Sequence, residues 1–101
     1  MKGKIVLVPF PFTGLTAAKL RPALVIYEGD RDVVVAFISS KVASQRCETG
    51  VVLTKSHVGF RQAGLKVDSV INLDKLATVL KDLVVGEIGE LNEELRQEVS
   101  Q

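Results

Sequence analysis

Residues that build metal centres and catalytic triads are scarce in this sequence. Its 101 residues include one cysteine, Cys47, and one histidine, His57. One cysteine cannot close an internal disulfide, and these two side chains cannot assemble a zinc site. His57 is the one histidine that a catalytic triad could use, and we interpret it as a surface or packing residue. We interpret Cys47 as an incidental thiol. We therefore expect no metal and no cofactor, and a reducing compartment, the cytoplasm.

Long apolar runs are also missing. The longest clearly apolar stretch covers residues 5–12, whereas a membrane-spanning helix needs about 20 residues. Lys2 and Lys4 precede this stretch as in a secretory signal, but Pro9 and Pro11 interrupt it and disfavour a helix. We expect no membrane association. The sequence also has no G-x-x-x-x-G-K-[ST] phosphate loop, and a dinucleotide-binding fold needs a longer chain.

The composition is that of a globular protein, with 47% hydrophobic and 25% charged residues. It predicts a single domain over residues 1–101 and excludes a disordered chain. The net charge of +1 hides an uneven distribution: residues 1–85 carry 12 basic and 7 acidic side chains, and residues 86–101 carry one basic and five acidic ones. A basic body can attract phosphate backbones, although solvated surface charge is the commoner explanation.

Short runs rich in valine and isoleucine, bounded by turn residues, predict strands at residues 4–9, 23–27, 33–38, 51–53 and 69–73. Residues 28–32 read EGDRD and predict a hairpin turn. Residues 13–19 and 41–50 are expected to be connections, and residues 57–64 a short helical turn. A further strand is expected at residues 82–85, followed by a bend at Gly86 and Gly89.

One helix is predicted at the C-terminal end. Asn92 is a favourable N-cap, and Glu93 and Glu94 suit the positive end of a helix. Leu91, Leu95 and Val99 recur every four residues and form one apolar stripe. Many short strands followed by one helix predict a mainly β fold with a C-terminal α-helix, in the form of a small barrel.

Two positions could carry chemistry. Arg21 is a permanent cation whose fork suits phosphate oxygens, and Pro22 restricts it to extended conformations. Ser39 and Ser40, followed by Lys41, end an apolar strand and could hydrogen-bond to phosphate. By spacing alone, an Arg-Pro pair more often marks the start of a strand than an active site.

Longer segments are more specific. Residues 3–13 (GKIVLVPFPFT) and 19–26 (KLRPALVI) resemble the opening of the MazF/PemK toxin family. Residues 33–42 (VVVAFISSKV) resemble the second strand block of that family. The segments 64–65, 68–71, 73–78 and 88–91 resemble its later landmarks in the correct order, so the resemblance covers nearly the whole chain.

The resemblance implies an SH3-like barrel with a terminal helix, as in the MazF/PemK/CcdB-like toxins, and a homodimer. It implies a toxin of a type II toxin–antitoxin system that acts as a metal-independent, sequence-selective endoribonuclease, an mRNA interferase cutting single-stranded RNA. A cognate antitoxin is implied, with binding to promoter DNA only together with it. The family arginine and hydroxyl residue fall on Arg21 and Ser39 as catalytic residues. The residues expected to bind RNA are Thr13, Lys19, Ser40, Lys41, Ser69 and Thr78.

Those residue types suit cleavage of RNA, which supplies its own nucleophile, the 2′-OH. The protein must hold the phosphate in line, stabilise negative charge and manage a proton. Arg21 can act as a fixed cation, and Ser39 can donate to a non-bridging oxygen or orient the 2′-OH. The expected products carry a 2′,3′-cyclic phosphate and a 5′-OH.

The chain departs from the family pattern at three places. Lys4 replaces an acidic residue, and Ser39 replaces a threonine. Ala77 and Leu80 replace the arginine and aspartate of an Arg-Thr-x-Asp segment, which removes a cation and a carboxylate. These losses keep two alternatives open: a catalytically degenerate member that binds an antitoxin or inhibits another protein, and a small barrel that binds peptide or nucleic acid without toxicity.

Overall fold

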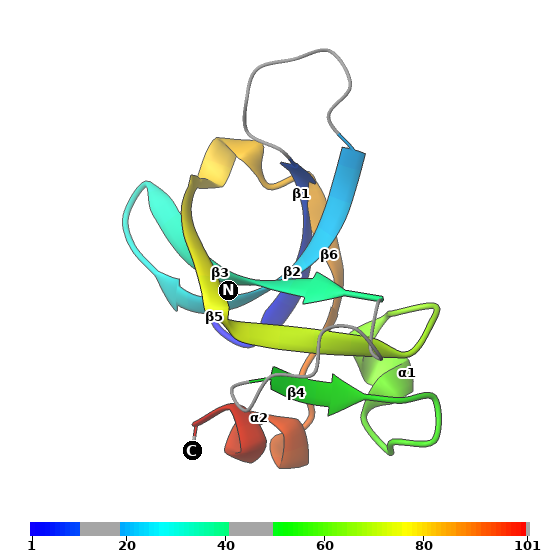
Figure 1. Cartoon of the computed structure of the whole chain (residues 1–101). Coiled ribbons are helices and arrows are strands. Elements are labelled where there is room, and N and C mark those ends of the chain that lie inside the picture. Colours follow the sequence, from blue (N-terminus) through cyan, green and yellow to red (C-terminus); the bar gives the residue numbers. More distant parts are fainter. Residues whose placement is uncertain (11–18, 41–49, 101) are drawn as a thin grey trace.

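The computed structural model describes residues 1–10, 19–40 and 50–100, which form a curled antiparallel sheet with two α-helices at one end (Figure 1). The elements in chain order are β1 (Lys4–Phe10), β2 (Lys19–Glu28), β3 (Asp32–Ser39), β4 (Gly50–Leu53), α1 (Phe60–Ala63), β5 (Ser69–Leu80), η1 (Lys81–Leu83), β6 (Gly86–Glu90) and α2 (Glu93–Ser100). The sheet order is β4-β5-β3-β2-β1-β6. The prediction of a mainly β fold with a C-terminal α-helix is confirmed. No helix in the described parts of the chain is long and apolar enough to cross a membrane.

Both faces of this sheet are buried over much of its area. In β3, Val33 and Val35 pack on one face, and Ala36 and Ile38 pack on the other. The first face carries the valine-rich cluster: Val6, Val8, Ala23, Val25, Val33, Val35 and Val79. The second carries the helix-side cluster: Ile5, Leu24, Ala36, Ile38, Val51, Leu53, Ala63, Ile71, Leu91 and Leu95. Burial on both faces explains why the strands read as continuous apolar runs rather than as alternating ones.

Strand β5 bends where it crosses β3. Ala36 pairs with Leu76, but the next residue of β3, Phe37, pairs with Asn72, so three residues of β5 have no partner in β3. Such an insertion bends the strand and interrupts the ladder. Figure 1 shows the two halves of β5 running in different directions. The N-terminal half pairs with β4 as well as β3, and the C-terminal half pairs with β3.

The local predictions are largely confirmed. All five predicted strand segments lie within strands, and the turn at residues 28–32 joins β2 to β3, closed by a hydrogen bond from the Gly29 N–H to the Asp32 carbonyl at 2.8 Å. The helical turn is α1, which ends at Gly64 with φ of 76°. Asn92 caps α2 by accepting a hydrogen bond from the Leu95 N–H at 2.9 Å. The predicted connections lie mostly outside the described residues, although Lys19 and Gly50 begin β2 and β4.

The strand predicted at residues 82–85 is wrong. Residues 81–83 form one 3-10 turn, and the Val84 N–H donates to the Lys81 carbonyl at 3.0 Å. The strand starts instead at Gly86, and Gly86 and Gly89 lie inside β6, which pairs with β1. Gly89 permits a close approach rather than a bend, because a Cβ there would lie 2.2 Å from the backbone of Ala63 in α1.

Replacing Gly89 with alanine should destabilise the protein by about 1–3 kcal/mol or more, because α1 and β6 would have to separate. Gly86→Ala is the matched control, since a Cβ at Gly86 would meet nothing within 4 Å. Chemical denaturation of the two variants measures the difference. Equal unfolding midpoints would contradict the close approach of α1 and β6.

The N-terminus is tied to the end of the β2–β3 hairpin. The Met1 ammonium lies 2.6 Å from one carboxylate oxygen of Glu28, and Lys81 Nζ lies 2.9 Å from the other. The hydrogen bond from the N-terminal ammonium, followed by that from Lys81, lowers the pKa of Glu28 to about 2. One carboxylate therefore joins β1, the hairpin and η1.

The contribution of Glu28 to stability should depend on pH. A carboxyl group whose pKa is lower in the folded than in the unfolded protein stabilises the fold above its unfolded pKa, near 4.5, and loses that effect as the pH falls towards 2. We expect Glu28→Gln to lower the melting temperature at pH 7 and the deficit to shrink below about pH 5. Glu87→Gln, on an exposed residue of β6, is the control. A deficit that stays constant down to pH 3 would contradict this.

Candidate functional site

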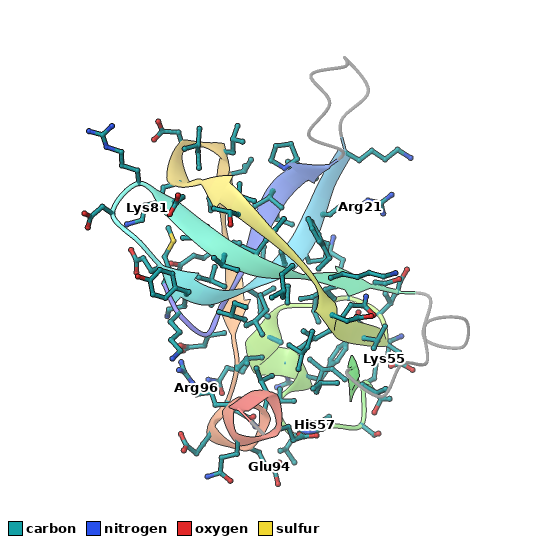
Figure 2. All side chains as sticks on the ribbon, turned by 60° about the vertical axis from the view of Figure 1, so that its left-hand side comes forward. Arg21, Lys55, His57, Lys81, Glu94 and Arg96 are labelled. Carbon is teal, nitrogen blue, oxygen red and sulfur yellow. The ribbon has the colours of Figure 1, made fainter. Side chains whose placement is uncertain are left out.

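Arg21 and Ser39 come together at one end of the β2–β3 ladder. The last pair of this ladder is Ala23 with Phe37, so Arg21 and Ser39 lie level, two residues further along. Residues two apart in a strand point to the same face, and opposing residues share a face, so both side chains lie on the face of Ala23 and Phe37. Figure 2 shows Arg21 projecting from the start of β2, far across the molecule from Lys81.

A cavity of about 700 Å³ opens beside these two residues. We call it the Arg21 cavity. Its polar lining residues are Arg21, Ser39, Ser40, Lys66, Ser69, Asn72 and Lys75, and the others are Leu7, Pro22, Phe37, Ile38, Gly64, Leu65, Val67 and Ile88. Three of these residues are cationic, and none of the described residues in the lining carries a carboxylate. The described lining of the cavity thus combines apolar side chains with an excess of positive charge, which suits a phosphate group attached to an apolar base.

The hydroxyl groups in the lining differ in exposure. Ser69 is 3% exposed and donates its hydroxyl proton to the Val67 carbonyl at 2.8 Å. It holds the turn that leads into β5 and presents only its lone pairs. Ser39 is half-buried and Ser40 is exposed. A substrate can reach Ser39 and Ser40 more readily than Ser69.

Four of the eight predicted site residues line this one cavity: Arg21, Ser39, Ser40 and Ser69. Lys19 is exposed at the start of β2, outside the lining. Thr78 lies opposite Val34, towards the far end of β3, and also outside the lining. Thr13 and Lys41 lie outside the described residues. Sequence reasoning missed Lys66, Asn72 and Lys75, because no local motif marks them.

The late-strand departures lie away from the Arg21 cavity. Ala77 pairs with Val35 and packs against the valine-rich cluster. Val35 in turn pairs with Val25, four residues from Arg21 and so about 13 Å along the strand. Leu80 pairs with Asp32 near the hairpin and is 57% exposed. Neither Ala77 nor Leu80 lines the Arg21 cavity.

The first departure, Lys4, has a structural contact. Its Nζ lies 3.0 Å from Oε2 of Glu90 across the β1–β6 pair, and this hydrogen bond lowers the pKa of Glu90. Lys4 is not part of the Arg21 cavity. A cation at this position therefore helps to join the edge strand β6 to β1.

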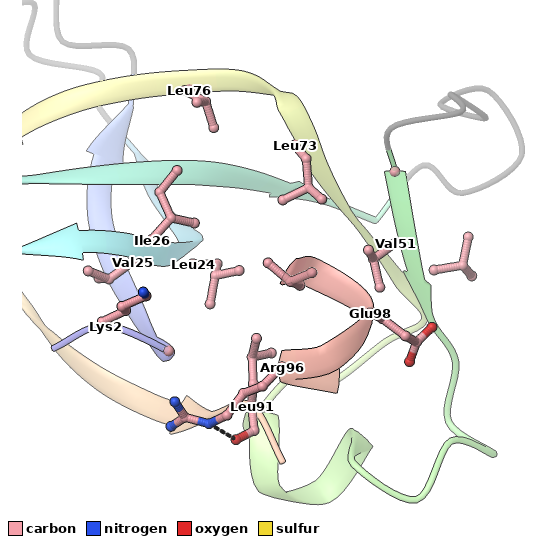
Figure 3. Close-up of a pocket in the computed structure, with 14 residues that line it drawn as sticks. Lys2, Leu24, Val25, Ile26, Val51, Leu73, Leu76, Leu91, Arg96 and Glu98 are labelled. Carbon is pink, nitrogen blue, oxygen red and sulfur yellow. Dashed lines mark hydrogen bonds between the residues drawn. The ribbon is translucent and has the colours of Figure 1, made fainter. Parts of the chain in front are cut away.

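A larger cavity of about 1070 Å³ lies between α2 and the sheet (Figure 3). Its lining is mostly apolar, and Lys2, Arg96 and Glu98 are its only charged members among the described residues. Arg96 donates from Nε to the Leu91 carbonyl at 3.3 Å. Although this cavity is larger, its described lining contains none of the predicted site residues.

His57 lies in neither cavity. Its Nδ1 accepts a hydrogen bond from the Gly59 N–H at 3.0 Å, and its Nε2 lies 3.3 Å from a carboxylate oxygen of Glu98. His57 thus ties the segment before α1 to α2. Cys47 lies outside the described residues, and among those described no three His, Cys, Asp or Glu side chains are grouped to hold a metal ion.

Comparison with known proteins places this geometry in a family. The whole chain, residues 1–101, matches the model of the PemK-like, MazF-like toxins of type II toxin–antitoxin systems. The chain belongs to this family. No curated protein sequence matches it. The resemblance seen in the motifs is therefore confirmed over the full length.

Solved structures share the family fold at low sequence identity. The Mycobacterium tuberculosis toxin MazF-mt6 superposes with a TM-score of 0.74 at 22% identity, over 96% of this chain and 88% of that one. An endoribonuclease in complex with its cognate antitoxin, from a mycobacterial species, gives a TM-score of 0.73 at 16% identity, over 99% of this chain and 86% of the other. At these identities the similarity establishes the MazF-like fold of the chain.

Proposed function

We propose that this family member is a metal-independent, sequence-selective endoribonuclease, an mRNA interferase that cuts single-stranded mRNA in the cytoplasm. The observation that carries the proposal is the shared cavity of Arg21 and Ser39, which combines fixed cations and hydroxyls over an apolar floor. The membership of the chain in the PemK-like, MazF-like family supports the toxin role. The solved relatives described as endoribonucleases are consistent with the same chemistry.

In the proposed reaction, the 2′-OH of the RNA attacks the adjacent phosphorus. The bond from O2′ to phosphorus forms, the bond from phosphorus to O5′ breaks, and a 2′,3′-cyclic phosphate and a 5′-OH result. Arg21 stabilises the charge that develops on the non-bridging oxygens. Ser39 donates to one of these oxygens or orients the 2′-OH. No described residue of the lining carries a carboxylate or imidazole, so we propose that water accepts the 2′-OH proton and supplies the proton to O5′.

The proposed partners follow from charge and family. A cognate antitoxin with an acidic tail would be attracted to the Arg21 cavity and would exclude RNA from it. One solved relative is indeed bound to its cognate antitoxin. We propose that promoter DNA is bound only by the toxin–antitoxin complex.

Purified protein should cleave single-stranded RNA in the presence of EDTA and leave 5′-OH ends. Arg21→Ala should reduce the rate by about 10²–10³-fold or more, because a fixed cation is lost from the transition state. Arg31→Ala, on an exposed arginine beyond the opposite end of β2, is the matched control and should cut normally. End mapping of the fragments measures both the rate and the chemistry.

Two outcomes would contradict the ribonuclease. One is RNA that stays intact at high protein concentration while circular dichroism shows a folded chain. The other is Arg21→Ala cutting as fast as the unchanged protein. Growth arrest on expression with intact RNA would favour the alternative, a degenerate member that acts by binding.

We further propose a homodimer formed over the larger cavity. Val52 and Leu76 line this cavity and remain 44% and 50% exposed, as an apolar surface that a second copy would cover. Sedimentation should give about twice the chain mass of 11.0 kDa. Leu76→Asp should give monomers, whereas Leu80→Asp, on a leucine of the same strand outside the cavity, should not. A mass near 11.0 kDa for the unchanged protein would contradict the dimer.

A further inference from the structure

The Arg21 cavity holds two lysines that no motif predicts. Lys66 comes from the connection between α1 and β5, and Lys75 comes from the bend of β5. Together with Arg21 of β2, they bring cations from three separate parts of the chain to one cavity. Both lysines are exposed to solvent, so a ligand can reach them.

The bend of β5 determines that Lys75 faces this cavity. Asn72 and Lys75 line the Arg21 cavity, whereas Leu73 and Leu76 line the larger cavity on the other face. In a regular strand, residues 72 and 75 would point to opposite faces, because the side-chain period is two. The three inserted residues are an odd number, and an odd insertion reverses which residues face each side.

Because of the same reversal, Ala77 lies next after Lys75 on one face of β5. Residues 75, 77 and 79 follow one another on one face, with Lys75 at the cavity and Ala77 and Val79 in the valine-rich cluster. The cation that β5 contributes to the Arg21 cavity is therefore at position 75. The absence of an arginine at position 77 leaves this contribution intact.

We propose that Lys75 and Lys66 form, with Arg21, a three-cation cradle that binds the phosphates of single-stranded RNA and positions the strand for attack. This inference rests on the proposed function. Arg21 faces the scissile phosphate, and Lys75 and Lys66 bind the neighbouring phosphates as positioning residues. The apolar floor, with Phe37 and Val67 in the lining, accommodates the bases between these contacts.

Binding and cleavage can be measured separately. The probe is a single-stranded RNA with a 2′-deoxy substitution at the mapped cleavage position, or the unmodified RNA itself if no cleavage is found. Removing one phosphate contact should lower the slope of log K against log salt by about 0.7 and weaken binding about fourfold at 0.15 M salt. We expect these changes for Lys75→Ala and for Lys66→Ala. Lys75→Arg should restore the slope.

Lys55→Ala is the matched control, because Lys55 is an exposed lysine in the neighbouring connection that lines neither cavity. Each variant is checked by circular dichroism and by its melting temperature. If the folded Lys75→Ala and Lys66→Ala proteins keep the affinity and salt slope of the unchanged protein, the cradle is overturned. If the slope falls in both variants but the unchanged protein never cuts unmodified RNA, the cradle stands and the ribonuclease fails.

Discussion

The pairing of β5 with β3 is the constraint on which the site depends. One strand serves two regions of the sheet, and it changes direction opposite the peptide between Ala36 and Phe37. Its first half pairs with β4 beside the helices, and its second half pairs with β3 as far as the hairpin. Both faces of the sheet are buried, so a change in which residues face each side must satisfy two clusters at once. The inserted residues at the bend meet this requirement and place Lys75 in the lining of the Arg21 cavity.

The distribution of charge in the fold follows from the same arrangement. The basic body of the sequence places three cations at the Arg21 cavity, whereas three of the five acidic residues of the last segment, Glu93, Glu94 and Glu98, lie on α2. Figure 2 shows Glu94 at the opposite end of the molecule from Arg21. Two acidic residues are paired with cations: Glu28 with the N-terminal ammonium and Lys81, and Glu90 with Lys4. This separation leaves a positive field at the cavity, where it would attract a polyanion.

Family membership and divergence are compatible in this chain. The Arg-Pro pair at the start of β2 places a permanent cation on a backbone that the following proline biases towards extended conformations. Ser39, expected from the motifs to replace a threonine, lines the Arg21 cavity and keeps a hydroxyl there. The other residues expected to depart from the family pattern lie in packing or pairing positions: Ala77 in the valine-rich cluster, Leu80 beside the hairpin, and Lys4 against Glu90. None of these last three residues belongs to the described lining of the Arg21 cavity.

Much of this fold could be predicted from the sequence, because it depends on interactions between neighbouring residues. The valine-rich runs, the EGDRD turn and the Asn92 cap each depend on neighbouring residues, and each was confirmed. The strand predicted at residues 82–85 was wrong, because their apolar side chains do not indicate that the edge strand begins only at Gly86. The spacing of Gly86 and Gly89 suggested a bend, whereas the need for Gly89 comes from α1, which lies far away in sequence.

The candidate site, like the fold, could be predicted from the sequence only in part. Arg21 and Ser39 were found because they lie in continuous motifs, and their meeting in one cavity follows from the ladder register. Lys75 was missed because a side-chain period of two cannot be counted through a bend that only strand pairing reveals. Lys66 was missed because it lies in the connection between α1 and β5, where no strand period applies. Thr78 was expected from the resemblance but lies outside the lining. The sequence by itself determined which elements form and which arginine is aimed by a proline. The tertiary structure alone decided which cations lie in the same cavity as that arginine. The face to which each β5 side chain points depends on how many residues of β5 have no partner in β3.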